Sequence, residues 1–366
     1  MTTSHPVRYS RFFDREAVSL ARAGYDVRLI GMGTQDETQS ESGVKLISFA
    51  RRTKPRMIAE VAMVAEQESC DVYQCLDPWT LRAGLRFKRR RGTKLVYESS
   101  EWFPRMRLDR KDQPLPVRWL GWLAVTRLES AAGRSADAII ETNQTRAGRF
   151  LRRGRTPVLV PNYPPLTMLP EPSPERKPWL AWTGLVSRPR GFDRLLSAMV
   201  PVARRFPEVR LRVIGGFDPR DDMESWARGF IRAQGIEANV EFLGSLPYQA
   251  MFEALRPCLA GLILFQPERG NDYTGQPNKL FEFMGSGLAV IASDFPEIAP
   301  AVLDAGSGWL VDPRSPDAIA GAMSAALTDP TACRARGEAG RRSVVERYHW
   351  GIAERALLDL YARLRR

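Results

Sequence analysis

The sequence predicts an α/β protein made of two doubly wound, Rossmann-like domains, and three observations support this fold class. The 366 residues exceed the usual size of a single core. Short apolar runs rich in β-branched residues alternate with longer amphipathic segments, and one proline-rich stretch interrupts the alternation. Because such domains bind ligands outside the carboxyl ends of their strands, we expect the two domains to face each other across a ligand cleft.

Residues 1–165 carry the pattern of the first domain. We expect strands at residues 26–31, 44–49, 71–75, 94–98, 138–142 and 158–160. Helical patterns cover residues 11–23, 55–69, 81–90 and 116–133. A doubly wound domain usually opens with a full strand, and here only Met1–Ser4 is available. We therefore expect either a very short first strand or a sequence that begins inside that strand.

The proline-rich stretch PNYPPLTMLPEPSPERKP, residues 161–178, contains seven prolines. Proline lacks an amide donor, so this stretch is neither a helix interior nor a central strand, and we assign residues 166–178 to a linker. Strands are expected again at residues 179–184, 209–214, 240–243, 259–265, 288–293 and 308–311. A second Rossmann-like domain thus covers residues 179–346, and residues 347–366 form a C-terminal helix expected to pack back on the first domain.

Composition excludes several classes of protein. No apolar run approaches the roughly 20 residues that span a bilayer, and the N-terminus lacks the basic-then-apolar order of a signal peptide. The four cysteines are too few for a disulfide framework and lack zinc-site spacing. We expect a cytoplasmic protein with reduced thiols.

Positive charge is concentrated in the first domain. The chain has a net charge of +12, and residues 1–165 hold 29 basic and 18 acidic side chains. One basic cluster contains Arg86, Lys88, Arg89, Arg90 and Arg91, and others include Arg51, Arg52 and Lys111. This field suits nucleic acid, an anionic membrane or a phosphate-bearing substrate, and the alternative is a solvated arginine-rich surface.

A membrane surface is our choice among these partners. Trp119 and Trp122 lie beside arginines in VRWLGWL, the composition of an interfacial helix. We therefore expect a protein peripheral on the inner face of the cell membrane, unless both tryptophans face the core. Nucleic acid is excluded because no nucleic-acid module is recognisable and the aromatic residues do not interleave with the basic clusters.

An anion site is expected in QPNKLFEFMGSGLAVIASDFP, residues 276–296. A strand and a polar loop precede a helix in which Pro277 is expected at the first position and whose apolar stripe ends near Gly287. The backbone amides of Asn278, Lys279 and Leu280 would point out of that helix at the carboxyl edge of the sheet, an arrangement suited to a diphosphate. Glu282, one turn further, would reach a ribose diol, and the alternative is an ordinary βαβ unit.

Three further loops follow strands in the second domain. Gly184 would let the backbone approach a ligand, and Arg190 with Arg188 would neutralise a leaving diphosphate unless both are simply solvated. The glycine pair Gly215 and Gly216 ends the next strand, and Leu243 lies at the end of another; both are candidate base-contacting edges.

Other catalytic motifs are missing from the sequence. It contains no phosphate-loop motif, no nucleophile elbow, no His-Glu-x-x-His helix and no Asp-x-Asp metal pair. The two histidines, His5 and His349, lie far apart in the sequence and neither has a carboxylate nearby. We therefore expect no metal and no cofactor. Cationic side chains and a helix dipole are expected to bind the anion instead.

These motifs together resemble the family 4 glycosyltransferases of the GT-B fold. The similarity rests on WTGLVSRPRGFDRLLSA, VRLRVIGG, VEFLGSLPYQAM, PNKLFEFMGSGLAVIASDFPEI and GWLVDPRSPDAIAGAM across residues 179–330. It extends more loosely through FFDREAVSLARAGYDVRLIG, VYESSEWFP and RYHW. Among family members, the sequence is most similar to those that build exopolysaccharides or lipid-linked glycans.

The resemblance implies a metal-independent, retaining transfer of a sugar from a nucleotide-sugar, with UDP preferred, to a hydroxyl of a glycan or lipid-linked acceptor. It places Arg190 on the diphosphate and Glu282 on the ribose, and it makes residues 1–165 the acceptor domain. The family's Asp-x-His-Glu stretch matches residues 98–101, so Ser100 and Glu101 join Arg190 as catalytic candidates.

Three positions depart from the family pattern. Thr274 stands where the family has the first of two glutamates, Leu185 stands in place of an arginine, and Ser100 replaces the histidine. The resemblance assigns such positions to the donor sugar and to alignment of the acceptor. A catalytically silent nucleotide-sugar-binding relative therefore remains an alternative, and a nucleotide-sugar epimerase is a second one.

Overall fold

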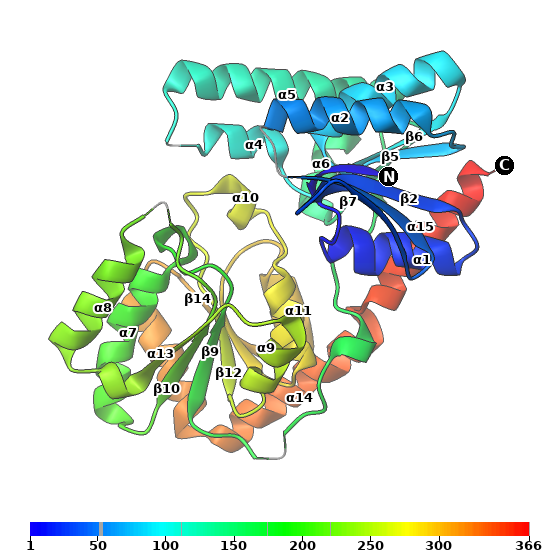
Figure 1. The fold of residues 1–366 in the computed structure, drawn as a ribbon. Coiled ribbons are helices and arrows are strands. Elements are labelled where there is room, and N and C mark those ends of the chain that lie inside the picture. Colours follow the sequence, from blue (N-terminus) through cyan, green and yellow to red (C-terminus); the bar gives the residue numbers. More distant parts are fainter. Residues whose placement is uncertain (51–53, 111, 174, 220, 366) are drawn as a thin grey trace. The chain divides into compact units, whose positions relative to one another are not determined.

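A computed structural model describes residues 1–50, 54–110, 112–173, 175–219 and 221–365 of the chain (Figure 1). Within it, the chain divides into two compact units. Unit 1 contains Met1–Asn162 together with Trp350–Arg366, and unit 2 contains Tyr163–His349. Arg51, Arg52, Lys111 and Pro174, named in the sequence analysis, lie outside the described residues.

Unit 1 is built on an eight-stranded sheet with the order β3-β4-β2-β1-β5-β6-β7-β8. Its strands are β1 (Thr2–Pro6), β2 (Val27–Gly33), β3 (Glu37–Glu41), β4 (Val44–Ala50), β5 (Val72–Cys75), β6 (Lys94–Ser99), β7 (Ala138–Glu141) and β8 (Val158–Leu159). All neighbours pair in parallel except β3 and β4, which are antiparallel.

Apolar side chains cover both faces of this sheet. Consecutive residues go to opposite faces, so Leu29 belongs to one core cluster and Ile30 to the other. The helices are η1, a π-helical segment (Arg11–Ala17), α1 (Val18–Arg22), α2 (Lys54–Gln67), α3 (Pro78–Arg91), α4 (Phe103–Leu108), α5 (Leu115–Ser135), α6 (Gln144–Leu151) and α15 (Trp350–Leu364). Buried strands with helices on both faces explain why strands of this unit read as continuous apolar runs.

The C-terminal helix α15 belongs to unit 1. Trp350 contributes to the core beside η1 and α1, and its indole Nε1 donates to the Ser19 hydroxyl at 2.9 Å. Further along, the Tyr361 hydroxyl donates to the amide oxygen of Gln74 on β5.

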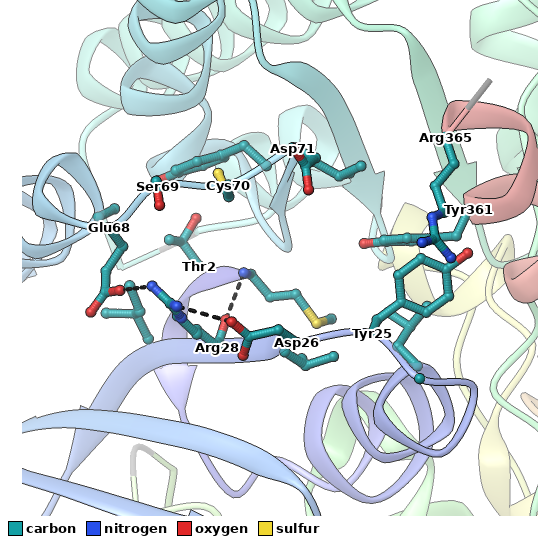
Figure 2. A pocket seen from close by; sticks show the side chains of 18 residues that line it. Thr2, Tyr25, Asp26, Arg28, Glu68, Ser69, Cys70, Asp71, Tyr361 and Arg365 are labelled. Atoms are coloured by element: carbon teal, nitrogen blue, oxygen red, sulfur yellow. Dashed lines mark hydrogen bonds and ion pairs between the residues drawn. The ribbon is translucent and has the colours of Figure 1, made fainter.

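The first strand is short but central. β1 lies between β2 and β5, and its pairing begins with Thr2 opposite Ile30 and Cys75. The backbone amine of Met1 donates to the Arg28 carbonyl at 2.8 Å, and a cavity of about 240 Å³ lies at this amino-terminal end of the strands (Figure 2). Tyr25, Cys70 and Tyr361 are among its lining residues.

Unit 2 contains a fully parallel six-stranded sheet with the order β11-β10-β9-β12-β13-β14. Its strands are β9 (Trp179–Thr183), β10 (Arg210–Ile214), β11 (Val240–Gly244), β12 (Ala260–Ile263), β13 (Ala289–Ser293) and β14 (Gly308–Val311). The chain runs outward from β9 in one direction and then from β12 in the other, so the switch point of this doubly wound sheet lies between β9 and β12.

The helices of unit 2 pack against the sheet, and the buried side chains form two hydrophobic clusters. Trp182 and Phe192 lie in one cluster, and Phe281 and Phe283 lie in the other. The helices are η2 (Leu166–Met168), η3 (Arg188–Arg190), α7 (Phe192–Arg205), α8 (Met223–Gln234), η4 (Glu237–Asn239), α9 (Tyr248–Leu255), α10 (Gly270–Tyr273), α11 (Asn278–Gly285), α12 (Ala299–Ala305), α13 (Pro316–Thr328) and α14 (Pro330–Arg347).

The proline-rich segment is anchored to unit 2. Tyr163 is buried against Phe281 and Tyr348, and the Arg176 guanidinium donates to the carbonyls of Cys258 and Ser286 at 2.6 and 2.9 Å. Apart from the short turn η2, its described residues form no helix or strand.

The predicted fold class is confirmed, and the twelve strands expected from the alternation are present with shifts of at most two residues at their ends. The missed strand is β3, whose ETQSE sequence is partly or fully exposed and carries no apolar signal. It turns back on β4 through Ser42 and Gly43, whose φ values are +50° and +78°. Among the described residues, no helix is both long and apolar enough to cross a bilayer.

Candidate functional site

The loops after β9, β10 and β12 meet at the carboxyl edge of the unit 2 sheet. Their backbones pack so closely that two positions require glycine. A Cβ atom on Gly215, where φ is +154°, would lie 2.0 Å from the Gly184 carbonyl oxygen. A Cβ atom on Gly191, where φ is +81°, would lie 2.1 Å from the Leu264 carbonyl oxygen. These contacts hold the loop that carries Arg190 against the end of β12.

Two cationic side chains converge on one aromatic ring at this edge. The Arg190 guanidinium lies 4.7 Å from the centroid of Phe265, and the Lys279 ammonium lies 5.3 Å from the same centroid. Arg190 Nε is buried and has no hydrogen-bond partner among the described residues. Because a buried donor normally has a hydrogen-bond partner, this pair of cations is suited to an anion supplied from outside the unit.

Lys279 is the more unusual of the two cations. Its side chain is buried beside Gly184, and its amine donates to the carbonyl of Thr183 at the end of β9. Burial lowers the pKa of Lys279 to about 7, and the charge of Arg190 adds to the fall, whereas Glu282 and Asp272 oppose it.

The first turn of α11 differs in two details from the expectation. Pro277 is the residue before the helix, not its first residue. The Leu280 amide donates to the Pro277 carbonyl at 3.0 Å, so the structure contradicts its assignment as an available anion donor. The backbone of Asn278 and Lys279 opens the helix at the sheet edge, as expected.

Glu282 lies one turn into α11 and is buried, and its carboxylate accepts a hydrogen bond of 3.0 Å from the Tyr248 hydroxyl of α9. Tyr248 was not predicted as a site residue, because a tyrosine inside an amphipathic pattern reads as core.

The structure directs Arg188 away from Arg190. Its guanidinium pairs with Asp222 at 3.0 Å and lies 5.0 Å from the ring centroid of Trp226 on α8. The expectation that Arg188 joins Arg190 on the anion is therefore contradicted. Both arginines lie in a single turn of 3₁₀ helix, in which successive side chains point in different directions.

The other residues predicted to bind the nucleotide-sugar donor lie at the same edge of the sheet, and their contacts are less specific. Gly216 follows Gly215 after β10, and Leu243 lies within β11, packed against the core that contains Phe281. Thr274 is buried after α10, where its hydroxyl donates to the Gly270 carbonyl at 2.9 Å.

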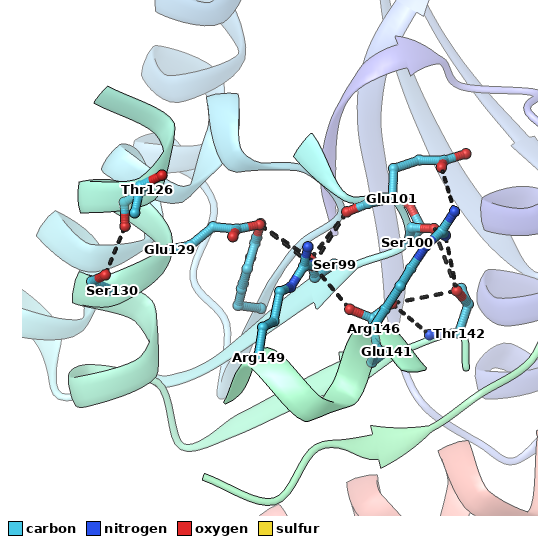
Figure 3. A network of polar contacts seen from close by, with 11 residues as sticks. Ser99, Ser100, Glu101, Thr126, Glu129, Ser130, Glu141, Thr142, Arg146 and Arg149 are labelled. Atoms are coloured by element: carbon cyan, nitrogen blue, oxygen red, sulfur yellow. Dashed lines mark hydrogen bonds and ion pairs between the residues drawn. The ribbon is translucent and has the colours of Figure 1, made fainter. Parts of the chain in front are cut away.

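In unit 1, Ser100 and Glu101 follow β6 and belong to a polar network (Figure 3). The Glu101 carboxylate pairs with Arg146 at 3.3 Å, and the Ser100 carbonyl accepts from the same guanidinium at 2.8 Å. The Glu101 side chain is 42% exposed, so it can still face a ligand. Among the described residues, the Ser100 hydroxyl forms none of the hydrogen bonds of this network.

Arg149 is the centre of the buried part of the network. Its guanidinium pairs with Glu141 at 2.9 Å and with Glu129 at 3.6 Å, and it also donates to the Ser99 hydroxyl (Figure 3). Burial raises the pKa of Glu141 to about 7, although Arg149 and Arg146 oppose the rise. Neither arginine was predicted. Asn143 could have indicated them from the sequence. It caps α6, the helix after β7 that carries both arginines.

A pH-dependent loss of stability follows from Glu141. Its pKa is about 7 in the folded chain and near 4.5 otherwise, so between these values the folded state holds more protons than the unfolded state. Stability should therefore fall as pH rises from 5 to 7, by up to about 1.4 kcal/mol per pH unit. We expect Glu141→Gln to flatten this dependence in urea denaturation at pH 5, 6 and 7, and the exposed Glu175→Gln to retain it. A variant profile as steep as the wild type would contradict the assignment.

The predicted membrane residues lie on α3 and α5 of unit 1. Arg89, Arg90 and Arg91 are exposed, Arg86 is exposed beside Glu66, and Lys88 pairs with Asp137. Trp119 is 54% exposed and contacts Trp122 edge to face. The alternative in which both tryptophans face the core is therefore wrong for Trp119.

Two family models match the chain, one in each unit. The model for group 1 glycosyl transferases matches residues 177–329, and the model for a glycosyl transferase 4-like domain matches residues 9–163. The chain belongs to the group 1 glycosyltransferases. Its resemblance to the family 4 members with the GT-B fold is thereby confirmed.

Relatives of this chain include the phosphatidyl-myo-inositol mannosyltransferase of Mycobacterium tuberculosis. The two are 29% identical over 192 residues, which cover 51% of this chain and 48% of the relative. The chain thus spans, in this match, about half the length of that relative.

Solved structures show the same fold. Sucrose-phosphate synthase from Thermosynechococcus elongatus matches with a TM-score of 0.77 and 18% identity, over 95% of this chain and 91% of that one. HepE from Anabaena, solved in complex with UDP-glucose, matches with a TM-score of 0.75 and 14% identity, over 99% and 98% of the chains.

Proposed function

We propose that the protein transfers a sugar from a nucleotide-sugar to a hydroxyl of a glycan or lipid-linked acceptor, with retention of configuration and without a metal. The observation that carries the proposal is the pair of cations at the switch point of the unit 2 sheet, the buried Lys279 and the half-buried Arg190. Departure of a nucleoside diphosphate develops negative charge, and fixed cations in a low-dielectric site stabilise that charge most effectively.

The proposed roles follow from the position of each group. Arg190 binds the diphosphate, the first amides of α11 add hydrogen bonds, and Glu282 accepts from the ribose hydroxyls. In unit 1, Glu101 is positioned by Arg146 and aligns the acceptor. Membership in the glycosyltransferase family and the chemistry of these groups support the proposal together.

UDP is the preferred nucleotide in this proposal, supported by the GT-B fold that the protein shares with HepE, which was solved with UDP-glucose. Thermal unfolding should be followed with UDP-, GDP-, ADP- and dTDP-sugars. A ligand present at 100 times its dissociation constant adds about 2.7 kcal/mol of stability. Absence of a shift with every nucleotide-sugar would refute donor binding, whereas binding without transfer to any acceptor would favour the silent relative.

Replacing Glu282 should separate binding from chemistry. We expect Glu282→Ala to weaken donor binding about tenfold while changing turnover of the bound donor much less, because a ribose contact is equally strong before and during the reaction. Titration calorimetry and kcat measurements test this. Tyr248→Phe, which removes the hydrogen bond to Glu282 and keeps the carboxylate, is the matched control and should have a smaller effect. A fall in kcat with unchanged affinity would contradict the ribose role.

A lipid-linked acceptor at an anionic membrane is the second part of the proposal. Leu115, Trp119 and Leu120 at the start of α5 are 61%, 54% and 68% exposed. The basic residues 89–91 are exposed at the end of α3, which lies beside the end of α5, because Lys88 pairs with Asp137 just after that helix. The exposed apolar residues at the start of α5 suit the boundary between headgroups and acyl chains, and the basic cluster is a separate surface for anionic headgroups. The relative that acts on phosphatidyl-myo-inositol supports a lipid acceptor.

Liposome flotation tests the membrane part. We expect recovery on anionic vesicles at low salt and release at high salt, since each basic residue near the surface contributes about 1 kcal/mol that salt screens. The double variant Trp119→Ser with Leu120→Ser should reduce recovery, and the control Leu303→Ser, an exposed leucine of unit 2, should not. Equal recovery on neutral and anionic vesicles would rule out electrostatic docking.

A further inference from the structure

The surroundings of the Lys279 amine offer fewer acceptors than an ammonium ion can use. An ammonium has three donors, and among the described residues its recorded acceptor is the Thr183 carbonyl alone. The ring centroids of Trp182 and Phe265 lie 5.0 and 5.3 Å from the nitrogen. A Cβ atom on Gly184 would lie 3.5 Å from it, so the amine lies directly beside the loop after β9.

Charged groups of both signs surround this amine. The second cation, Arg190, approaches the same Phe265 ring and, among the described residues, forms no ion pair with a carboxylate. Glu282 and Asp272 are the carboxylates that favour the charged amine, and the Glu282 carboxylate also accepts from Tyr248. The two cations repel one another, and an anion bound beside them would offset that repulsion.

We propose that the side chain of Lys279 binds the donor diphosphate as an ammonium and takes up its proton when the donor binds. This inference rests on the proposed function, and it assigns to the Lys279 side chain a role that the sequence analysis gave only to its backbone amide. It also supplies a second diphosphate cation beside Arg190.

Proton uptake follows from the electrostatics. Without ligand, burial and Arg190 hold the pKa of Lys279 at about 7, so above that pH the amine is mostly neutral. A bound diphosphate adds negative charge beside the nitrogen and raises its pKa. Donor affinity should consequently fall about tenfold per pH unit above pH 7, until the pH reaches the raised pKa of the complex.

The other charged groups at this position can be distinguished from Lys279. The Lys279→Met variant keeps Arg190 and both carboxylates, so a change in proton uptake in that variant belongs to Lys279. Glu282 and Asp272 face the amine from α11 and α10, and Glu282→Gln tests whether a carboxylate contributes to the pH dependence. The proton uptake should persist in that variant.

Titration calorimetry in buffers of different ionisation enthalpy measures the proton number directly. The probe is UDP, or GDP if GDP binds more tightly, used between pH 7.5 and 9, where a terminal phosphate with a second pKa near 6 is already ionised. We expect uptake of close to one proton at pH 8 in the wild type. Lys279→Arg should show no uptake and a flat affinity profile, and Lys279→Met should show no uptake and at least tenfold weaker binding.

The outcomes separate the two proposals. Failure of the wild type to bind any nucleoside diphosphate would refute the proposed function, and this inference with it. Binding with no proton uptake, or with uptake that persists in Lys279→Met, would overturn the inference and leave the proposed function intact. Absence of proton uptake in the wild type overturns the inference even if Lys279→Met does not fold, and Lys279→Arg then provides the second variant.

Discussion

Replacement of Arg190 by alanine is expected to lower turnover about 100-fold or more. The half-buried guanidinium lies against Phe265 at the carboxyl edge of the unit 2 sheet, where a fixed positive charge stabilises a departing diphosphate. Because the effect appears where charge develops, kcat should fall more than donor affinity. Steady-state kinetics with the donor identified by thermal shift provide the measurement.

Arg188→Ala is the matched control for this variant. Arg188 lies two residues earlier in the same turn, yet it pairs with Asp222 and is 39% exposed. A surface ion pair of this kind contributes about 1 kcal/mol or less, so we expect turnover within about threefold of the wild type. If Arg188→Ala were the damaging variant and Arg190→Ala the harmless one, the diphosphate would have been assigned to the wrong side of the loop.

Arg149→Ala is expected to destabilise unit 1 by about 3–5 kcal/mol. Arg149 is the counter-charge of Glu141 and also contacts Glu129, and both carboxylates are buried, so its loss leaves them without that compensation. Hydrogen exchange of the β6 and β7 amides reports this unit separately from unit 2.

Arg152→Ala is the control for Arg149→Ala. It removes an exposed arginine directly after α6, and we expect it to stay within about 0.5 kcal/mol of the wild type. Equal stability of the two variants would show that the network is not needed for the fold of unit 1.

Periodicity predicted most of the fold, because buried parallel strands produce apolar runs that need no tertiary information to recognise. Residues 259–265 and 288–293 are examples, since they contain β12 and β13. The same reasoning missed β3. Its polar sequence forms a strand only because a turn through Ser42 and Gly43 brings it to the edge of β4.

For the candidate site, local sequence located the loops and the start of α11 but not the direction of individual side chains. Arg188 and Arg190 are indistinguishable in SRPRG, and only the packing of α8 and Phe265 separates them. Trp119 illustrates the same limit, because an apolar stripe does not reveal which face of α5 remains uncovered.

The sequence by itself determined the alternation of strands and helices, the proline-rich boundary, the basic first domain and the motif that begins α11. Tertiary structure alone decided that the Lys279 amine is buried between two aromatic rings and that Arg149 neutralises carboxylates from β7 and α5. The physical reason is that patterning depends on neighbours along the chain, whereas burial, charge pairing and the resulting pKa values depend on neighbours in space. Some of those spatial neighbours come from distant segments, as Trp182 does for Lys279 and Glu129 does for Arg149.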